Sequence, residues 1–185
     1  MMKIPKLVTY ILFGLMFAIP GEILNQILAR HNVAAFKATL TSYTVLLFIG
    51  YFVGKGLYRI FKNRRRTAIA NYLLFGTLGL MVEWLLLGNA PVADPFQIIT
   101  QPGMFTFWGT MLLGPLLMME NAEFLDLKRT FLGFFAAMSL AYLLVAIILP
   151  KDKGGIFLGF VLFAAGSTAL NYFYVKYFRQ LATLS

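Results

Sequence analysis

Long apolar stretches constrain this chain more than any other feature of its sequence. A helix needs roughly 20 mostly apolar residues to cross a hydrocarbon core about 30 Å thick. Runs such as 142–149 are continuously apolar, without the alternation of a membrane β-strand, so their backbone groups must pair within helices. We therefore predict an all-α polytopic integral membrane helix bundle, one domain over 1–185, with about six transmembrane helices at 7–28, 39–58, 68–87, 104–119, 130–149 and 156–177.

The composition excludes a water-soluble monomer. Of the 185 residues, 60% are hydrophobic and only 12% are charged, whereas a soluble domain has about a quarter charged residues. The mean hydropathy is +0.78. The fourth stretch is the shortest and contains Gly114-Pro115, so we expect it to be kinked or partly re-entrant.

Positive charges predict the orientation, because Lys and Arg concentrate on the cytoplasmic side. With both termini cytoplasmic, four basic residues fall on the outer side: Arg30, Lys37, Lys151 and Lys153. Eleven fall on the inner side: Lys3, Lys6, Arg59, Lys62, Arg64, Arg65, Arg66, Lys128, Arg129, Lys176 and Arg179. We expect an N-in, C-in protein of a bacterial inner (plasma) membrane.

Missing residue types exclude several membrane enzymes. There is no Cys and a single His, His31, so Cys-based metal sites, redox CxxC motifs and bis-histidine haem cannot be built. No P-loop motif is present. We expect no metal and no cofactor, and we do not expect nucleic acid as a partner, because one juxtamembrane basic cluster is a poor platform for it.

Two acidic residues fall at membrane depth, where ionisable groups are costly and tend to be functional or paired. Glu22 and Glu83 each lie 15 residues beyond the start of their stretch, about 22 Å along a helix. Both carboxylates should therefore lie at one level in the outer half of the membrane.

Polar and aromatic neighbours complete the predicted ligand-binding site. Glu22 and Glu83 would recognise charge, Lys37 would modulate them, and the other side chains would orient or enclose the ligand: Asn25, Gln26, Gln101, Trp84 and Trp108. The alternative interpretation is a structural Glu–Lys–Asn network that ties three helices together, because buried polar groups must be paired with or without a ligand.

The basic run Arg64-Arg65-Arg66 follows the second stretch. It is typical of a topological stop signal, and it also suits anionic lipid headgroups as partners, at about 1 kcal/mol per basic residue.

The favoured function is a small-molecule or ion carrier, or the membrane binding subunit of one, rather than an enzyme. Two alternatives stay open. The chain could be an accessory or structural subunit with partner membrane subunits, or an enzyme that modifies a lipid or isoprenoid with Glu22 or Glu83 as acid or base.

Overall fold

The computed structural model describes residues 5–29, 31–85, 97–148 and 153–183. These residues form helices and no strands, as the apolar pattern predicts. In chain order the elements are α1 (Lys6–Glu22), the π-helix η1 (Ile23–Ala29), α2 (Val33–Phe61), α3 (Arg64–Leu85), α4 (Gln97–Met118), the 3-10 turn η2 (Ala122–Phe124), α5 (Leu125–Ile148) and α6 (Lys153–Thr183).

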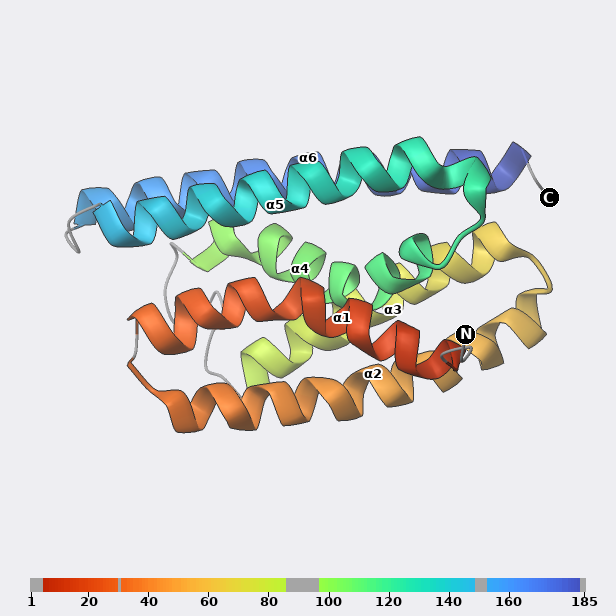
Figure 1. Cartoon of the computed structure of the whole chain (residues 1–185), viewed down its shortest axis with the longest axis horizontal. Coiled ribbons are helices and arrows are strands. Elements are labelled where there is room, and N and C mark those ends of the chain that lie inside the picture. The colour runs from red at the N-terminus through yellow and green to blue at the C-terminus, as the bar shows by residue number, and fades with distance from the viewer. Residues whose placement is uncertain (1–4, 30, 86–96, 149–152, 184–185) are drawn as a thin grey trace.

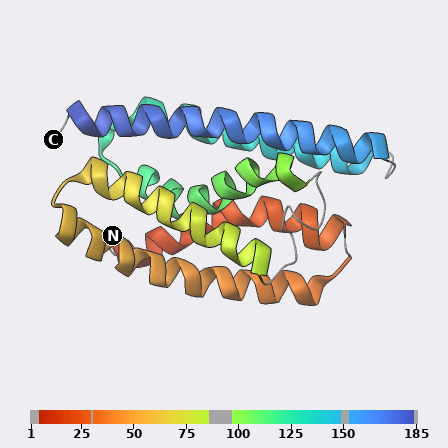
Figure 2. The same ribbon diagram turned by 180° about the vertical axis from the view of Figure 1, so that it is seen from behind.

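The helices run lengthwise beside one another, with α5 and α6 paired along one side of the bundle (Figure 1). The start of α1 and the end of α6 lie at the same end of the bundle in both views (Figures 1 and 2). The α2–α3 connection also lies at this end, and we call it the terminal end. We call the other end, which holds the α1–α2 connection, the distal end.

Within the described residues, four helical segments are long and apolar enough to cross a membrane: Lys6–Leu28, Val33–Phe61, Arg64–Leu85 and Ala122–Val145. The all-helical bundle is therefore confirmed, together with its suitability for a membrane. The number of crossings and the side on which the termini lie stay predictions.

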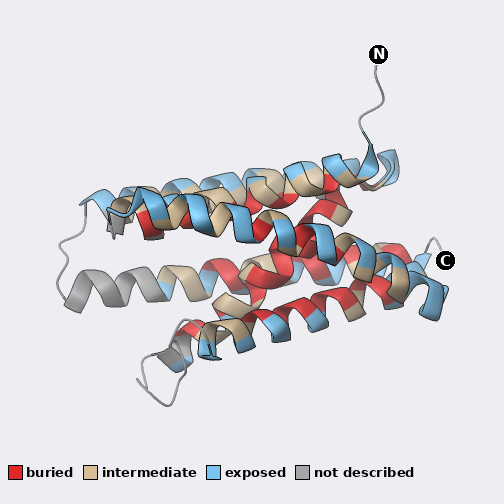
Figure 3. Ribbon diagram, turned by 90° about the horizontal axis from the view of Figure 1, so that it is seen from below, coloured by how far each residue is buried: buried red, intermediate tan, exposed pale blue. Residues whose placement is uncertain are grey.

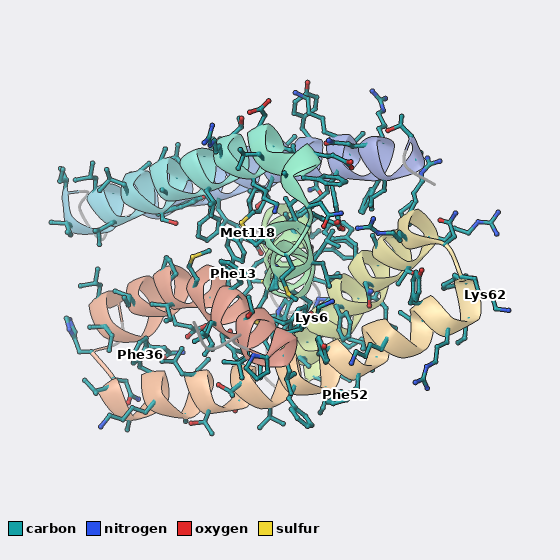
Figure 4. The ribbon with its side chains drawn as sticks, turned by 45° about the vertical axis from the view of Figure 1, so that its right-hand side comes forward. Lys6, Phe13, Phe36, Phe52, Lys62 and Met118 are labelled. Atoms are coloured by element: carbon teal, nitrogen blue, oxygen red, sulfur yellow. The ribbon has the colours of Figure 1, made fainter. Side chains whose placement is uncertain are left out.

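The α2–α3 connection is only two residues long and is fixed by local hydrogen bonds. Lys62 takes a left-handed conformation with φ of 49°, and its backbone N–H donates to the carbonyl oxygen of Tyr58 at 2.8 Å. Asn63 Oδ1 then accepts the backbone N–H of Arg66 at 2.9 Å, which satisfies a donor in the first turn of α3. This tight reversal brings the basic end of α2 beside the basic start of α3, where Lys62 lies at the edge of the bundle (Figure 4).

The fourth helix, whose apolar stretch is the shortest, is the central one. α4 packs against α1, α3 and α6 and also touches α2. It continues through Pro102 and Pro115, and every residue from 108 to 115 is buried. Buried residues gather in the middle of the bundle (Figure 3), whereas side chains such as Phe52, 49% exposed, point away from it (Figure 4).

Glycines allow α3 and α4 to approach closely. A Cβ atom on Gly79 would lie 2.0 Å from Cγ of Trp108, and one on Gly109 would lie 2.4 Å from the ring of Tyr72. Small residues are the usual means of bringing membrane helices together, since lipid offers no hydrophobic drive for association. This contact sets the position of Trp108, which belongs to the candidate site.

Candidate functional site

Glu22, the last residue of α1, is a buried acid in the distal half of the bundle. Only 6% of its surface is exposed. The Tyr43 hydroxyl, from α2, donates a hydrogen bond of 2.6 Å to Oε1 of Glu22. Within the described part of the chain, the other carboxylate oxygen, Oε2, is buried without a hydrogen-bond partner, and no ion pair reaches Glu22 there. One half of the carboxylate is therefore satisfied and the other half is not.

Gln26 adds a second buried acceptor about one turn further along. It lies in the π-helix η1 and is 9% exposed. Its side-chain Oε1 has no hydrogen-bond partner among the described residues. Short π-helical segments occur frequently at functional sites, and this one begins directly after Glu22. The result is a pair of buried acceptor oxygens, on Glu22 and Gln26, that have no donor among the described residues.

Glu83 joins the same cluster from α3 through Trp108. The indole Nε1 of Trp108 donates to Oε1 of Glu83 at 3.1 Å. The Trp108 ring meets the Tyr43 ring edge-to-face, with centroids 5.6 Å apart and planes at 87°. Glu22 and Glu83 are therefore linked through an aromatic pair, in which the Tyr43 hydroxyl donates to Glu22 and the Trp108 indole N–H donates to Glu83. We call these four side chains the acidic cluster.

Trp84 and Gln101, two more of the predicted residues, contact each other. Trp84 Nε1 donates to Oε1 of Gln101 at 2.6 Å, which forms a second α3–α4 link. Lys37 is exposed and makes no ion pair within the described residues. Asn25 belongs to η1, but its side chain lies outside the part that the structure describes.

Tyr43 is the member of the cluster that sequence reasoning did not assign to the site. A sequence signal for it exists, because Tyr43 lies seven residues before Gly50 and so shares its helix face. Both residues are buried. A tyrosine on the packed face of an apolar helix needs a hydrogen-bond partner, and here that partner is Glu22.

A mostly apolar cavity of about 540 Å³ adjoins the acidic cluster. Phe107 lines the cavity, and its ring centroid lies 6.4 Å from that of Tyr43 and 6.2 Å from that of Trp108. The Thr110 and Tyr142 hydroxyls also line it, and they have no partner among the described residues. The cavity is bounded by α1, α4, α5 and α6.

Glu120, in the α4–α5 connection, is an enclosed acid with two side-chain partners. The Tyr177 hydroxyl donates to its Oε1 at 2.8 Å, and Arg64 forms an ion pair with its Oε2. The Glu120 side chain is 9% exposed. All three arginines of the basic run predicted to attract lipid are exposed. Arg64 differs from Arg65 and Arg66 because it forms an ion pair with Glu120.

Comparison with known proteins finds no matching protein family, no similar curated protein and no similar solved structure. The class that fold and site define is therefore a membrane-compatible α-helical bundle with an acidic cluster in its distal half.

Proposed function

We propose that this chain is a membrane carrier for a proton or a small cation, including a protonated amine, or the binding subunit of such a carrier. In this proposal the chain crosses a bacterial inner membrane six times with both termini in the cytoplasm. The distal half then faces outward. The binding group is Glu22, and the supporting observation is its buried Oε2, which has no hydrogen-bond partner in the part of the chain that the structure describes.

The chemical class of the ligand follows from the counter-charge and the hydrogen-bond donor that Glu22 and Gln26 do not have among the described residues. A buried charge without a counter-charge is costly in an apolar medium, and ionisable groups at membrane depth commonly mark ion or proton pathways. Glu22 Oε2 and Gln26 Oε1 both accept hydrogen bonds. A guest that fits them must donate a hydrogen bond or coordinate to oxygen, and the carboxylate charge favours a proton, a metal cation or an ammonium group over a neutral guest.

Tyr43 and Trp108 are uncharged partners of the two acids. Each donates one hydrogen bond to one carboxyl group without supplying a positive charge. Glu83 brings a second carboxyl group to the cluster, and a carboxylate attracts a cation rather than an anion.

A second candidate role is the binding or modification of a lipid or isoprenoid, and the apolar cavity is the observation that favours it. Its two unpartnered hydroxyls could take the polar end of such a molecule. In this case the protein would bind an apolar molecule in the absence of any cation.

The test is flux through liposomes that contain the purified full-length chain. A membrane potential is imposed with potassium and valinomycin, and the entry of protons, sodium ions and methylammonium is measured in parallel. We expect at least one of these to move in the wild-type liposomes. Glu22→Gln removes the charge but keeps an oxygen to accept from Tyr43, so it should abolish that flux without loss of folded protein.

Glu123→Gln is the matched control, because Glu123 is an exposed acid in η2 at the terminal end of the bundle. It should transport as the wild type does. Transport by Glu22→Gln at the wild-type rate, or no movement of any of the three probes in wild-type liposomes, would contradict the carrier function.

A further inference from the structure

A second cavity, of about 560 Å³, lies at the terminal end of the bundle, away from the acidic cluster. It is lined by residues of α1, α2, α3, α4 and α6 and by Glu120. Its charged lining consists of Lys55, Arg59 and Arg64 against the single carboxylate of Glu120, a net charge of +2. We call this space the basic cavity.

Two of its cations are not neutralised. Arg64 pairs with Glu120, but Lys55 and Arg59, one helical turn apart on α2, form no ion pair within the described residues. The Lys55 ammonium lies 4.5 Å from the ring centroid of Tyr51, which also lines the cavity. This cation–π contact holds the charge at the cavity wall and leaves its N–H groups able to donate.

The start of α3 strengthens the positive potential. Three arginines occupy its first turn, where the helix dipole disfavours positive charge. Positive-inside topology accounts for Arg65 and Arg66, which lie outside the cavity lining, whereas Arg64 lines the cavity. A phosphate group would receive both the side-chain charges and the positive end of the helix.

The basic cavity also contains a buried polar side chain, that of Asn71. It is 3% exposed, it lines the cavity, and its Oδ1 has no hydrogen-bond partner among the described residues. Its amide lies against Gly54, where a Cβ atom would come 3.4 Å from Asn71 Nδ2. The inner part of the cavity therefore offers a buried acceptor, while Lys55 and Arg59 at its exposed rim offer donors.

We propose that the basic cavity binds a glycerol phosphate group, with the phosphate on Lys55 and Arg59 and a glycerol hydroxyl donating to Asn71. A phosphate ester supplies the anion, and a neighbouring hydroxyl supplies the donor that Asn71 lacks. The group can belong to the headgroup of phosphatidylglycerol or to soluble glycerol 3-phosphate. This site is independent of the proposed carrier function, since none of its residues belongs to the acidic cluster.

The experiment compares two double variants that each remove two exposed positive charges. Lys55→Gln with Arg59→Gln alters the cavity, and Arg65→Gln with Arg66→Gln alters the adjacent surface outside its lining. The full-length chain is placed in nanodiscs of equal phosphatidylglycerol and phosphatidylcholine, and native mass spectrometry measures retained lipid. In a second arm, calorimetry in neutral detergent measures binding of glycerol 3-phosphate and of inorganic phosphate.

We expect the wild type to retain phosphatidylglycerol over phosphatidylcholine, or to bind glycerol 3-phosphate more tightly than inorganic phosphate. The first result identifies the lipid as the source, and the second identifies the soluble ester. The cavity variant should lose about fivefold in affinity for each charge removed, and the surface variant less than about twofold in total. A thermal midpoint at the wild-type value confirms that both variants fold.

Equal losses in the two double variants would show general surface attraction and overturn the proposal. So would an unchanged affinity in the cavity variant, or the absence of binding in both arms. Asn71→Leu tests the hydroxyl contact: it should remove the preference for glycerol 3-phosphate over inorganic phosphate, or that for phosphatidylglycerol over phosphatidic acid.

Discussion

Two glutamates, in opposite halves of the bundle, share the same local arrangement and differ in one partner. Glu22 accepts a hydrogen bond from Tyr43 at 2.6 Å, and Glu120 accepts one from Tyr177 at 2.8 Å. The second oxygen of Glu120 pairs with Arg64, whereas that of Glu22 has no partner among the described residues. Glu120 is thus a completed structural contact between α3, α6 and the α4–α5 connection, and Glu22 is an incomplete one.

Glu22 and Glu120 show that burial and a tyrosine partner do not by themselves distinguish a structural acid from an acid that binds a ligand. What distinguishes them is the presence of a counter-charge. A buried carboxylate with a cation is compensated, whereas one without a cation retains the capacity to bind one.

The largest expected effect concerns the contact that positions Trp108. Gly79→Ala places a Cβ atom within 2.4 Å of both Cβ and Cγ of Trp108, the stem of a rigid side chain that cannot rotate away. We expect a loss of about 3 kcal/mol in the free energy of unfolding. In a Trp84→Phe background, Trp108 is the remaining indole, and its fluorescence emission should shift to longer wavelength as the indole leaves its buried site.

Gly133→Ala is the control for this prediction. Nothing lies within 4 Å of a Cβ atom on Gly133, inside α5, so alanine should be neutral or should stabilise by up to about 1 kcal/mol through its helix propensity. If Gly79→Ala were equally harmless, the close α3–α4 approach would be wrong.

The two tyrosines provide the second prediction. Tyr43→Phe removes the hydrogen bond to a buried carboxylate that has no cation among the described residues, and we expect it to cost about 2 kcal/mol. Tyr177→Phe leaves Glu120 paired with Arg64 and should cost about 1 kcal/mol. Chemical unfolding in the same detergent measures both. A larger loss for Tyr177→Phe would reverse the ranking of the two acids.

The smallest expected changes in stability come from replacing the two acids, and the two replacements should act in opposite directions. Glu120→Gln breaks the ion pair with Arg64 and should destabilise the protein by about 1 kcal/mol, a modest value because the Arg64 side chain is 43% exposed. Glu22→Gln removes an uncompensated buried charge, so stability should be unchanged or higher. Thermal midpoints compare the two variants, and a marked loss for Glu22→Gln would indicate that its charge is structural.

Much of the helical architecture could be predicted, because hydrophobicity is a local property of the chain. The predicted stretches 7–28 and 68–87 correspond to Lys6–Leu28 and to Arg64–Leu85. The central position of α4 could not be predicted, since its apolar stretch is the shortest. Its place depends on where glycines such as Gly109 meet rings of other helices.

For the candidate site, the sequence could predict the depth of residues along their helices, because depth is also a local property of the chain. Counting residues along a helix estimates depth, and it placed Glu22 and Glu83 at one level. Depth does not fix rotation about the helix axis. Lys37 was expected near the acids from its depth, yet the structure places it on an exposed face of α2, and the face toward α1 carries Tyr43 instead.

The sequence by itself determined that this chain forms apolar helices long enough for a membrane, and that two acids lie within them. Only the tertiary structure showed that a third acid, Glu120, has a cation as its partner, whereas Glu22 has none among the described residues. Arg64 and Glu120 are 56 residues apart in the chain, and they meet because α3 and α4 run antiparallel between the same two ends of the bundle (Figure 1). Such a pairing depends on how helices pack against one another, and no local pattern of residues encodes it.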